Sequence, residues 1–254
     1  FEHSDPLAHS SPESHYHMSN DSSNWFVLRD WMNSHRNDAA VTISYIYDLS
    51  FDCLITYYSR RFFIKAKEHI LCCILHMKED MQYSLEDGSQ LTFVHERIYK
   101  HKVLRINYTS YDMRRCQDSI NPHIPDHSNV MVLVSGSDEV GADPYWYARV
   151  LGVFHVMAQH NQGQPCRFDF LWVCWYGIDS TYKYGWKYKR MPRIRFIDST
   201  EDCAFGFLDP ACVIRAVHLI PAFSLGSTKA FLGPSIARQD CENNEDWYRY
   251  YVGM

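Results

Sequence analysis

Apolar and polar residues alternate most regularly in two segments near the middle of the chain, residues 145–156 and 168–177. A period of two is typical of a β-strand that buries one face. The many aromatic and β-branched residues also favour strands over helices here. One face of the first segment is expected to carry Trp146, Ala148, Val150, Phe154 and Val156. One face of the second is expected to carry Phe168, Phe170, Trp172, Cys174 and Tyr176.

The same alternation continues in two later segments. Ile194 and Phe196 alternate with Arg193 and Arg195, and residues 213–223 show a looser version of the pattern. Short strands that follow one another closely in sequence favour an antiparallel arrangement. We therefore predict four or five strands that form a small antiparallel β-barrel or a strongly twisted sheet.

The first half of the chain has mixed patterns. Residues 25–32 have helical spacing and follow side chains suited to capping, and residues 61–81 form a long segment without Gly or Pro, which predicts a helix. Residues 39–58 fit either a strand or a helix. Residues 90–107 predict two strands around a turn near Lys100, residues 108–127 a polar connection, and residues 129–134 another strand. The predicted fold class is α+β, mainly β, with a helix-containing N-terminal region before the β core.

These patterns divide the chain into four parts. Residues 1–24 are polar and are expected to be a disordered tail. Residues 25–128 form the α/β N-terminal region, and residues 129–226 form the barrel-like core domain. Residues 227–254 lose the alternating pattern and are expected to be a truncated C-terminal extension.

Composition narrows the class of protein. The 254 residues carry a formal net charge of −5, which argues against coating of nucleic acid by the whole surface but allows a local basic face. Nine cysteines without any Cys-x-x-Cys pair indicate a reduced, intracellular compartment rather than a disulfide framework. No apolar run approaches the ~20 residues of a spanning helix, so no membrane association is expected.

A possible metal motif lies in the predicted helix 61–81. His69, Cys72, Cys73 and His76 fall on one helical stripe, and zinc prefers these ligand types. One straight helix cannot surround a tetrahedral ion, however, and buried cysteine is a common core residue. We interpret the four residues as packing residues and expect no metal site and no cofactor. No motif of a catalytic site occurs either, so we expect neither an enzyme nor a small-molecule substrate.

The most distinctive signal is the basic, aromatic segment 183–195. Its six basic residues have no acidic residue among them, and four aromatic residues are interleaved with them or directly precede them. Lysine and arginine neutralise phosphates, and exposed aromatic rings stack on bases. The alternative is a solvated sheet edge whose charges prevent edge-to-edge pairing. The candidate nucleic-acid-binding residues are Lys183, Trp186, Lys187, Lys189, Arg190, Arg193 and Arg195.

A second hypothesis uses the aromatic residues of the two central segments. Aromatic side chains that converge can form a cage that holds a methylated ammonium group by cation–π attraction. The alternative for these residues is ordinary core packing. The cage candidates are Tyr145, Tyr147, Trp172, Trp175 and Tyr176.

Five stretches resemble a known family. The runs NYTSYDMRRCQDSINP (107–122), PYWYARVLGVFHV (144–156), FLWVCWYG (170–177), GFLDPACVIRAVHLIPAF (206–223) and LGPSIARQ (232–239) resemble the C-terminal region of fungal Plavaka-type transposases. The similarity covers residues 98–252. It implies a cut-and-paste element whose RNase H-like core, with a carboxylate triad for two divalent metals, lies upstream. No residue of this chain corresponds to that triad, and Cys116 stands where the family pattern implies an acidic residue.

The pattern around residues 145–149 and 171–176 is also similar to BAH-type chromatin modules, which implies a small β-barrel. Together these observations lead to one hypothesis. We expect a non-catalytic accessory region of a transposase-like protein, located in the nucleus, that binds DNA or chromatin through residues 183–195. The alternative is a protein-interaction or histone-reading module that uses the aromatic cage.

Overall fold

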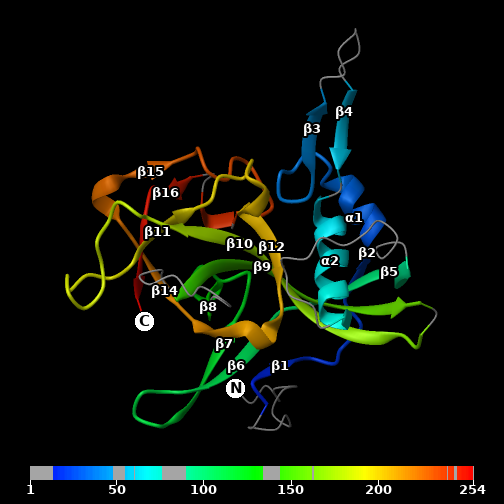
Figure 1. Cartoon of the computed structure of the whole chain (residues 1–254), viewed down its shortest axis with the longest axis horizontal. Helices are drawn as coiled ribbons and strands as arrows, with labels where there is room; N and C mark the ends of the chain where they lie inside the picture. The colour runs from blue at the N-terminus through cyan, green and yellow to red at the C-terminus, as the bar shows by residue number, and fades with distance from the viewer. Residues whose placement is uncertain are drawn as a thin grey trace.

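The fold is described from a computed structural model, which defines residues 14–47, 55–59, 61–75, 90–133, 144–161, 163–238, 240–242 and 245–253. These residues form a mainly β protein in which two α-helices pack beside antiparallel sheets (Figure 1). The mainly β, antiparallel character predicted from the alternating segments is therefore confirmed. None of the sheets that the described residues form is closed into a barrel.

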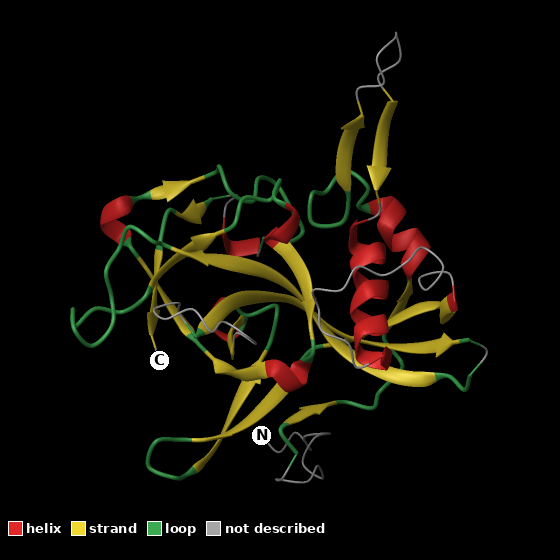
Figure 2. Ribbon diagram, viewed as in Figure 1, coloured by secondary structure: helices red, strands yellow, loops and turns green. Residues whose placement is uncertain are grey.

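Two long strands form the centre of the main sheet. Strand β9 (Tyr145–His160) pairs antiparallel with β10 (Cys166–Ile178), and both correspond to the strongly alternating segments of the sequence. On its other edge β9 pairs with β8 (Asn129–Leu133) at one end and with β5 (Leu91–His101) at the other. Strand β10 pairs in turn with β11 (Arg193–Phe196) and β12 (Phe205–Leu208). Figure 2 shows these strands curving through the middle of the molecule.

The remaining strands extend this sheet to ten. Its main strand order is β13-β8-β9-β10-β11-β17-β14, where β13 is Val213–Ala216, β14 is His218–Pro221 and β17 is Tyr250–Gly253. The short strand β2 (Trp25–Val27) pairs with β5. Strands β13 and β14 are separated by Val217 alone yet lie at opposite ends of this order. The sheet must therefore curl until its two edges approach each other, although no ladder closes it.

This sheet crosses the predicted domain boundaries. It takes β2 and β5 from residues 25–128, its central strands from residues 129–226, and β17 from the predicted extension. The C-terminal segment is thus an integral strand of the sheet rather than an appendage. Residues 246–247 form a further short strand, β16 (Asp246–Trp247), which pairs with β15 (Ser227–Thr228).

A β-bulge changes the face assignment predicted for β9. The ladder with β10 shifts register between Trp172 and Val173, so that Leu151 is the extra residue. Before the bulge, Ala148 and Val150 point into one core cluster; after it, Phe154 and Val156 point into the other. The prediction that these four residues share a face is therefore wrong, because an extra residue inverts the side-chain alternation. The face predicted for β10 is confirmed, since Phe170, Trp172, Cys174 and Tyr176 all lie in one cluster.

A smaller sheet covers the opposite cluster. Its strands are β1 (Tyr16–Met18), β6 (Leu104–Thr109) and β7 (Arg115–Ile120). Two sequence predictions are corrected here. Residues 16–18 belong to a sheet rather than to a disordered tail, and residues 115–120 form a strand rather than a polar connection. Polar side chains alternate with Ile120 and the half-buried Cys116 on β7, which hid the pattern. Residues 1–13 lie outside the described residues.

The helices differ from their predicted bounds. Helix α1 (Leu28–Ser34) starts later than expected, because residues 25–27 pair with β5, and no side chain caps its N-terminus. Helix α2 is Arg61–Leu75 and buries Phe62, Ala66, Ile70 and Leu71 against the sheet. Residues 76–81 of the predicted helix lie outside the described residues. The ambiguous segment 39–58 contains a β-hairpin of β3 (Ile43–Tyr47) and β4 (Ile55–Ser59), which projects from the molecule in Figure 1.

A pair of buried histidines lies between β5 and β9. His101 Nε2 and His155 Nδ1 are 2.6 Å apart, so one ring donates a hydrogen bond to the other. His155 also stacks on Tyr99, its cross-strand partner. Burial, together with the nearby guanidinium of Arg167, lowers the pKa of both rings, that of His155 to about 3. Burial likewise lowers the pKa of His69 on α2 to about 4.

These histidines predict that folding stability falls as the pH is lowered. An unfolded histidine titrates near pH 6.5, so below that pH the unfolded chain binds protons that the native chain excludes. The free energy of unfolding should decrease from about pH 6.5 down towards pH 4, by up to ~1.4 kcal/mol per pH unit for each neutral buried histidine. Urea denaturation between pH 7.5 and 5 measures this slope. The His155→Gln variant should have a shallower slope than the variant of exposed His218, His218→Gln. A wild-type stability that is flat over this range would contradict the prediction.

Gly152 provides a second prediction. A Cβ atom at this position would lie 2.3 Å from Cζ of Phe154, whose ring is buried against Phe26 and Phe170. The Gly152→Ala variant should lose ~1–3 kcal/mol of unfolding free energy, because the packed ring has to move. At Gly177 the nearest contact of such a Cβ is 3.6 Å away, so Gly177→Ala should cost clearly less. Equal losses in the two variants, measured by urea denaturation, would show that Phe154 does not limit the site.

Candidate functional site

The loop between β10 and β11 carries most of the predicted nucleic-acid-binding residues. At its base, the Asp179 carboxylate accepts hydrogen bonds from Thr181, from Arg193 Nε at 3.0 Å and from Arg249 Nε at 3.1 Å. Burial raises the pKa of Asp179, but these hydrogen bonds outweigh burial and lower it to about 2. The guanidinium of Arg193 also lies 4.0 Å from the centre of the Tyr182 ring. Both ends of the loop are therefore fixed to the sheet.

The tip of this loop is a tight turn. Gly185 and Arg190 form an isolated β-bridge, with Gly185 donating its backbone N–H to the Arg190 carbonyl at 2.8 Å. Gly185 has φ +91°, a conformation that a residue with a side chain rarely adopts. The turn presents Trp186 to solvent with 99% of its surface exposed. A fully exposed tryptophan on a well-defined turn has no packing role within the described part of the chain. In Figure 1 the loop is the yellow segment that extends from the body of the molecule.

A groove of about 870 Å³ runs beside this turn. One wall is the loop itself, and the other is the start of β9 together with Val252 of β17. Its lining is mostly aromatic or basic and contains no carboxylate among the described residues. The aromatic lining residues are Tyr145, Tyr147, Tyr182, Tyr184, Trp186 and Tyr188.

The structure divides the seven predicted nucleic-acid-binding residues into two groups. Arg193 pairs with Asp179, and Arg195 lies 5.2 Å from the Phe231 ring, so these two serve internal contacts. The other five surround the turn. No ion pair with a described residue involves their four cations, and two of these, Lys183 and Lys187, lie about 6 Å from the ring of Tyr188. The five are Lys183, Trp186, Lys187, Lys189 and Arg190.

The alternative of a guarded sheet edge does not fit β11. This strand pairs with β10 on one side and with β17 on the other, so its backbone is not an open edge. The cationic side chains of residues 183–190 precede β11 in the sequence, so they do not lie along an unpaired strand edge. Their concentration at the turn thus requires another explanation.

The five cage candidates do not converge. Trp172 lies in the core, in edge-to-face contact with Phe62 and Trp31. Tyr176 is also buried, stacked on Phe196, while Trp175 points to the opposite face of the sheet, beside Trp146. Only Tyr145 and Tyr147 line the groove. Successive side chains along β9 and β10 point to opposite faces of the sheet. Aromatic residues that are adjacent in sequence are therefore separated in space.

The metal-like stripe of α2 is only partly described. Cys73 Sγ lies 3.9 Å from His69 Nε2, and His69 packs against the rings of Phe170 and Phe207. His76 lies outside the described residues. Within the described part of the chain, no three His, Cys, Asp or Glu side chains come together as a metal site. The described cysteines are all free thiols.

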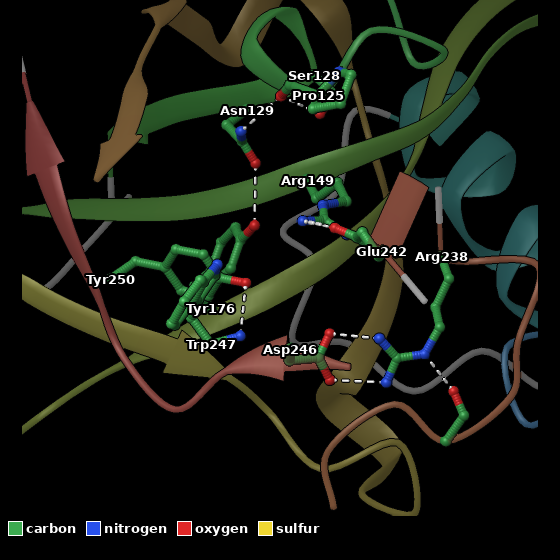
Figure 3. A network of polar contacts seen from close by, with 11 residues as sticks. Pro125, Ser128, Asn129, Arg149, Tyr176, Arg238, Glu242, Asp246, Trp247 and Tyr250 are labelled. Carbon is green, nitrogen blue, oxygen red and sulfur yellow. Dashed lines mark hydrogen bonds and ion pairs between the residues drawn. The ribbon is translucent and has the colours of Figure 1, made fainter. Parts of the chain in front are cut away.

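A network of buried polar side chains lies between β9 and the C-terminal segment (Figure 3). Both guanidinium Nη atoms of Arg149 contact the Glu242 carboxylate, at 3.0 and 2.7 Å. Arg238 forms a second bidentate pair with the fully buried Asp246. The Tyr176 hydroxyl donates to Asn129 Oδ1 at 2.9 Å. The Arg149–Glu242 pair thus connects the central strand β9 to a segment about ninety positions later, and the Arg238–Asp246 pair holds that segment together.

Sequence reasoning missed two features, and only the first has a visible signal in the sequence. Arg149 is two residues after the buried Tyr147 in β9, so both side chains lie on the same face of the strand. A charged side chain that points into the protein could therefore have been expected there. Tyr145 and Tyr147 were recognised as aromatic candidates but not as partners of residues 182–190. No local signal reports that pairing, because it depends on how the sheet curls.

Comparison with family models, with curated proteins and with solved structures found no match for the chain. The resemblances to transposases and to BAH modules therefore stay predictions from the sequence. Neither helix among the described residues has the length and apolar character needed to cross a membrane.

The buried ion pairs predict a large effect of a small substitution. In Glu242→Gln the guanidinium of Arg149 would remain buried without its counter-charge, which should cost ~3–5 kcal/mol of unfolding free energy. The matched control is Glu96→Gln, which breaks the exposed pair with Arg29 and should cost less than ~1 kcal/mol. Urea denaturation of both variants tests this. A loss for Glu242→Gln no larger than that for Glu96→Gln would show that solvent reaches Arg149.

Proposed function

We propose that the chain binds nucleic acid through the turn at residues 183–190, with unpaired bases stacked on Trp186. One observation carries this proposal: a fully exposed tryptophan stands among four cations that have no carboxylate partner in the described structure. Aromatic rings stack on any base, and lysine and arginine neutralise the phosphates that link the bases.

The neighbouring groove extends the binding surface. Its tyrosines offer further ring faces and hydroxyl groups, and the cations at its mouth favour a polyanion. The anchored base of the loop holds the turn in place before binding, which reduces the conformational entropy lost on association. The overall charge of −5 confines attraction for DNA to this basic surface.

This role agrees with the expected accessory region of a transposase-like protein. Such a region needs no catalytic residues of its own. The proposed partner is DNA in chromatin, and the proposed location is the nucleus.

Charge reversal tests the proposal. The triple variant Lys187→Glu, Lys189→Glu, Arg190→Glu should weaken binding to single-stranded DNA and reduce the slope of log K against log salt by about 2, since each lost phosphate contact removes ~0.7. The matched control reverses three exposed cations elsewhere, Lys102, Arg114 and Lys229. Fluorescence anisotropy across a salt series gives both quantities. Equal effects of the two triple variants would place the binding surface elsewhere.

Removal of the ring separates stacking from charge. Trp186→Ala should lower affinity for single-stranded DNA by ~1–3 kcal/mol while leaving the salt slope unchanged. Binding to a fully paired duplex should change less, because its bases are not available for stacking. If Trp186→Ala leaves single-strand binding intact, the tryptophan does not stack on bases.

The alternative of a histone-reading module makes a different prediction. It requires binding of trimethyl-lysine peptides that is lost in a tyrosine variant of the groove, such as Tyr145→Ala. The positive charge of the groove mouth works against a methylammonium ligand. Saturable peptide binding without DNA binding would favour this alternative.

A further inference from the structure

A second cavity lies away from the turn, on the main sheet beside the bulge of β9. Its volume is about 400 Å³, which is within the range of small-molecule sites. Its residues come from six separate parts of the chain. They include Trp31, Lys100, Arg149, Leu151, Trp172 and Ile236.

The walls of this cavity are held in place. The Asp38 carboxylate accepts hydrogen bonds from Ser235 Oγ at 2.8 Å and from the Ile236 backbone N–H at 2.7 Å. These bonds connect the turn after α1 to the loop before Arg238. The floor contains the bulged residue Leu151, and bulges often occur where a strand redirects side chains towards a site.

The charged lining residues are all basic. Lys100, Arg149 and Arg238 line the cavity together with His35 and His123, and no carboxylate among the described residues does so. The partners of the two arginines, Glu242 and Asp246, are not among the lining residues (Figure 3). The side chain of Lys100 forms no ion pair with a described residue. The cavity therefore favours an anion.

The lining also includes four aromatic residues. Trp31 and Trp172 meet edge to face with ring centres 5.7 Å apart, and Phe26 meets Phe154 in the same way at 5.8 Å. Rings of this kind give a planar apolar group edges and faces to pack against.

We propose that this cavity binds a small organic oxyanion, a carboxylate or a phosphate attached to a planar apolar group. The oxyanion would accept a hydrogen bond from the Lys100 ammonium group, and the planar group would pack against Trp31 and Trp172. This site is independent of the proposed nucleic-acid surface, with which it shares no lining residue.

Calorimetric titration of the full chain tests the proposal with three probes of similar size. Phenylacetate carries a carboxylate, phenyl phosphate carries a phosphate, and 2-phenylethanol carries neither charge. At least one of the two anions should bind saturably with a stoichiometry of one, and at least tenfold more tightly than the alcohol. Binding of the alcohol as tightly as both anions, or no saturable binding of either anion, would overturn the proposal.

Two variants locate the binding. Lys100→Gln should weaken anion binding at least fivefold, whereas the matched variant of exposed Lys102, Lys102→Gln, should leave it unchanged. Ile236→Trp places a larger side chain at a lining residue that is already 37% exposed, and should block binding while the thermal midpoint stays near that of the wild type. Anion binding that survives both Lys100→Gln and Ile236→Trp would show that the anion binds outside this cavity.

Discussion

The structure depends on the antiparallel pairing of β9 with β10. Eleven residue pairs, between residues 147–158 of β9 and 166–176 of β10, form the ladder to which the other strands of the main sheet attach, directly or through other strands. Their side chains fill two hydrophobic clusters on opposite faces. The single bulge in this pair sets which residues face which cluster, so one extra residue determines the composition of both cores. Both strands line the cavity beside the bulge, and the start of β9 lines the groove.

Local alternation predicted the parts of the fold that are locally encoded. Strands β8, β9, β10 and β11 follow from their side-chain patterns, as does α2, because each buries one regular face. The short strands β1 and β7 carry polar or half-buried side chains, so their sequences show no clear alternation. Pairing with β6 is what makes them strands. Helix α1 was placed too early because Trp25 and Phe26 fit helical spacing and strand pairing equally well. The sequence predicted either a barrel or a strongly twisted sheet. It could not decide between them, because the order of the strands along the chain does not say whether β13 and β14 pair.

The candidate site was predictable only in part. The cations and rings of residues 183–190 are adjacent in sequence, so their clustering was visible there. The internal contacts of Arg193 and Arg195 were not, because Asp179 and Phe231 approach them only in the folded chain. The same holds for the second cavity, whose basic residues are scattered from His35 to Arg238. Buried ion pairs such as Arg149–Glu242 depend on partners about ninety residues apart, a separation at which composition gives no information.

The position of β17 has a consequence for how this chain folds. The strand inserts between β11 and β14, and β14 has no other ladder partner in the described sheet. Residues 218–221 therefore cannot pair into the sheet until residues 250–253 have been synthesised. Pairing over such separations is slow to form, because the intervening loop loses entropy before any contact is gained. Until then the edge of β11 is open, and newly made chains expose it to pairing with one another.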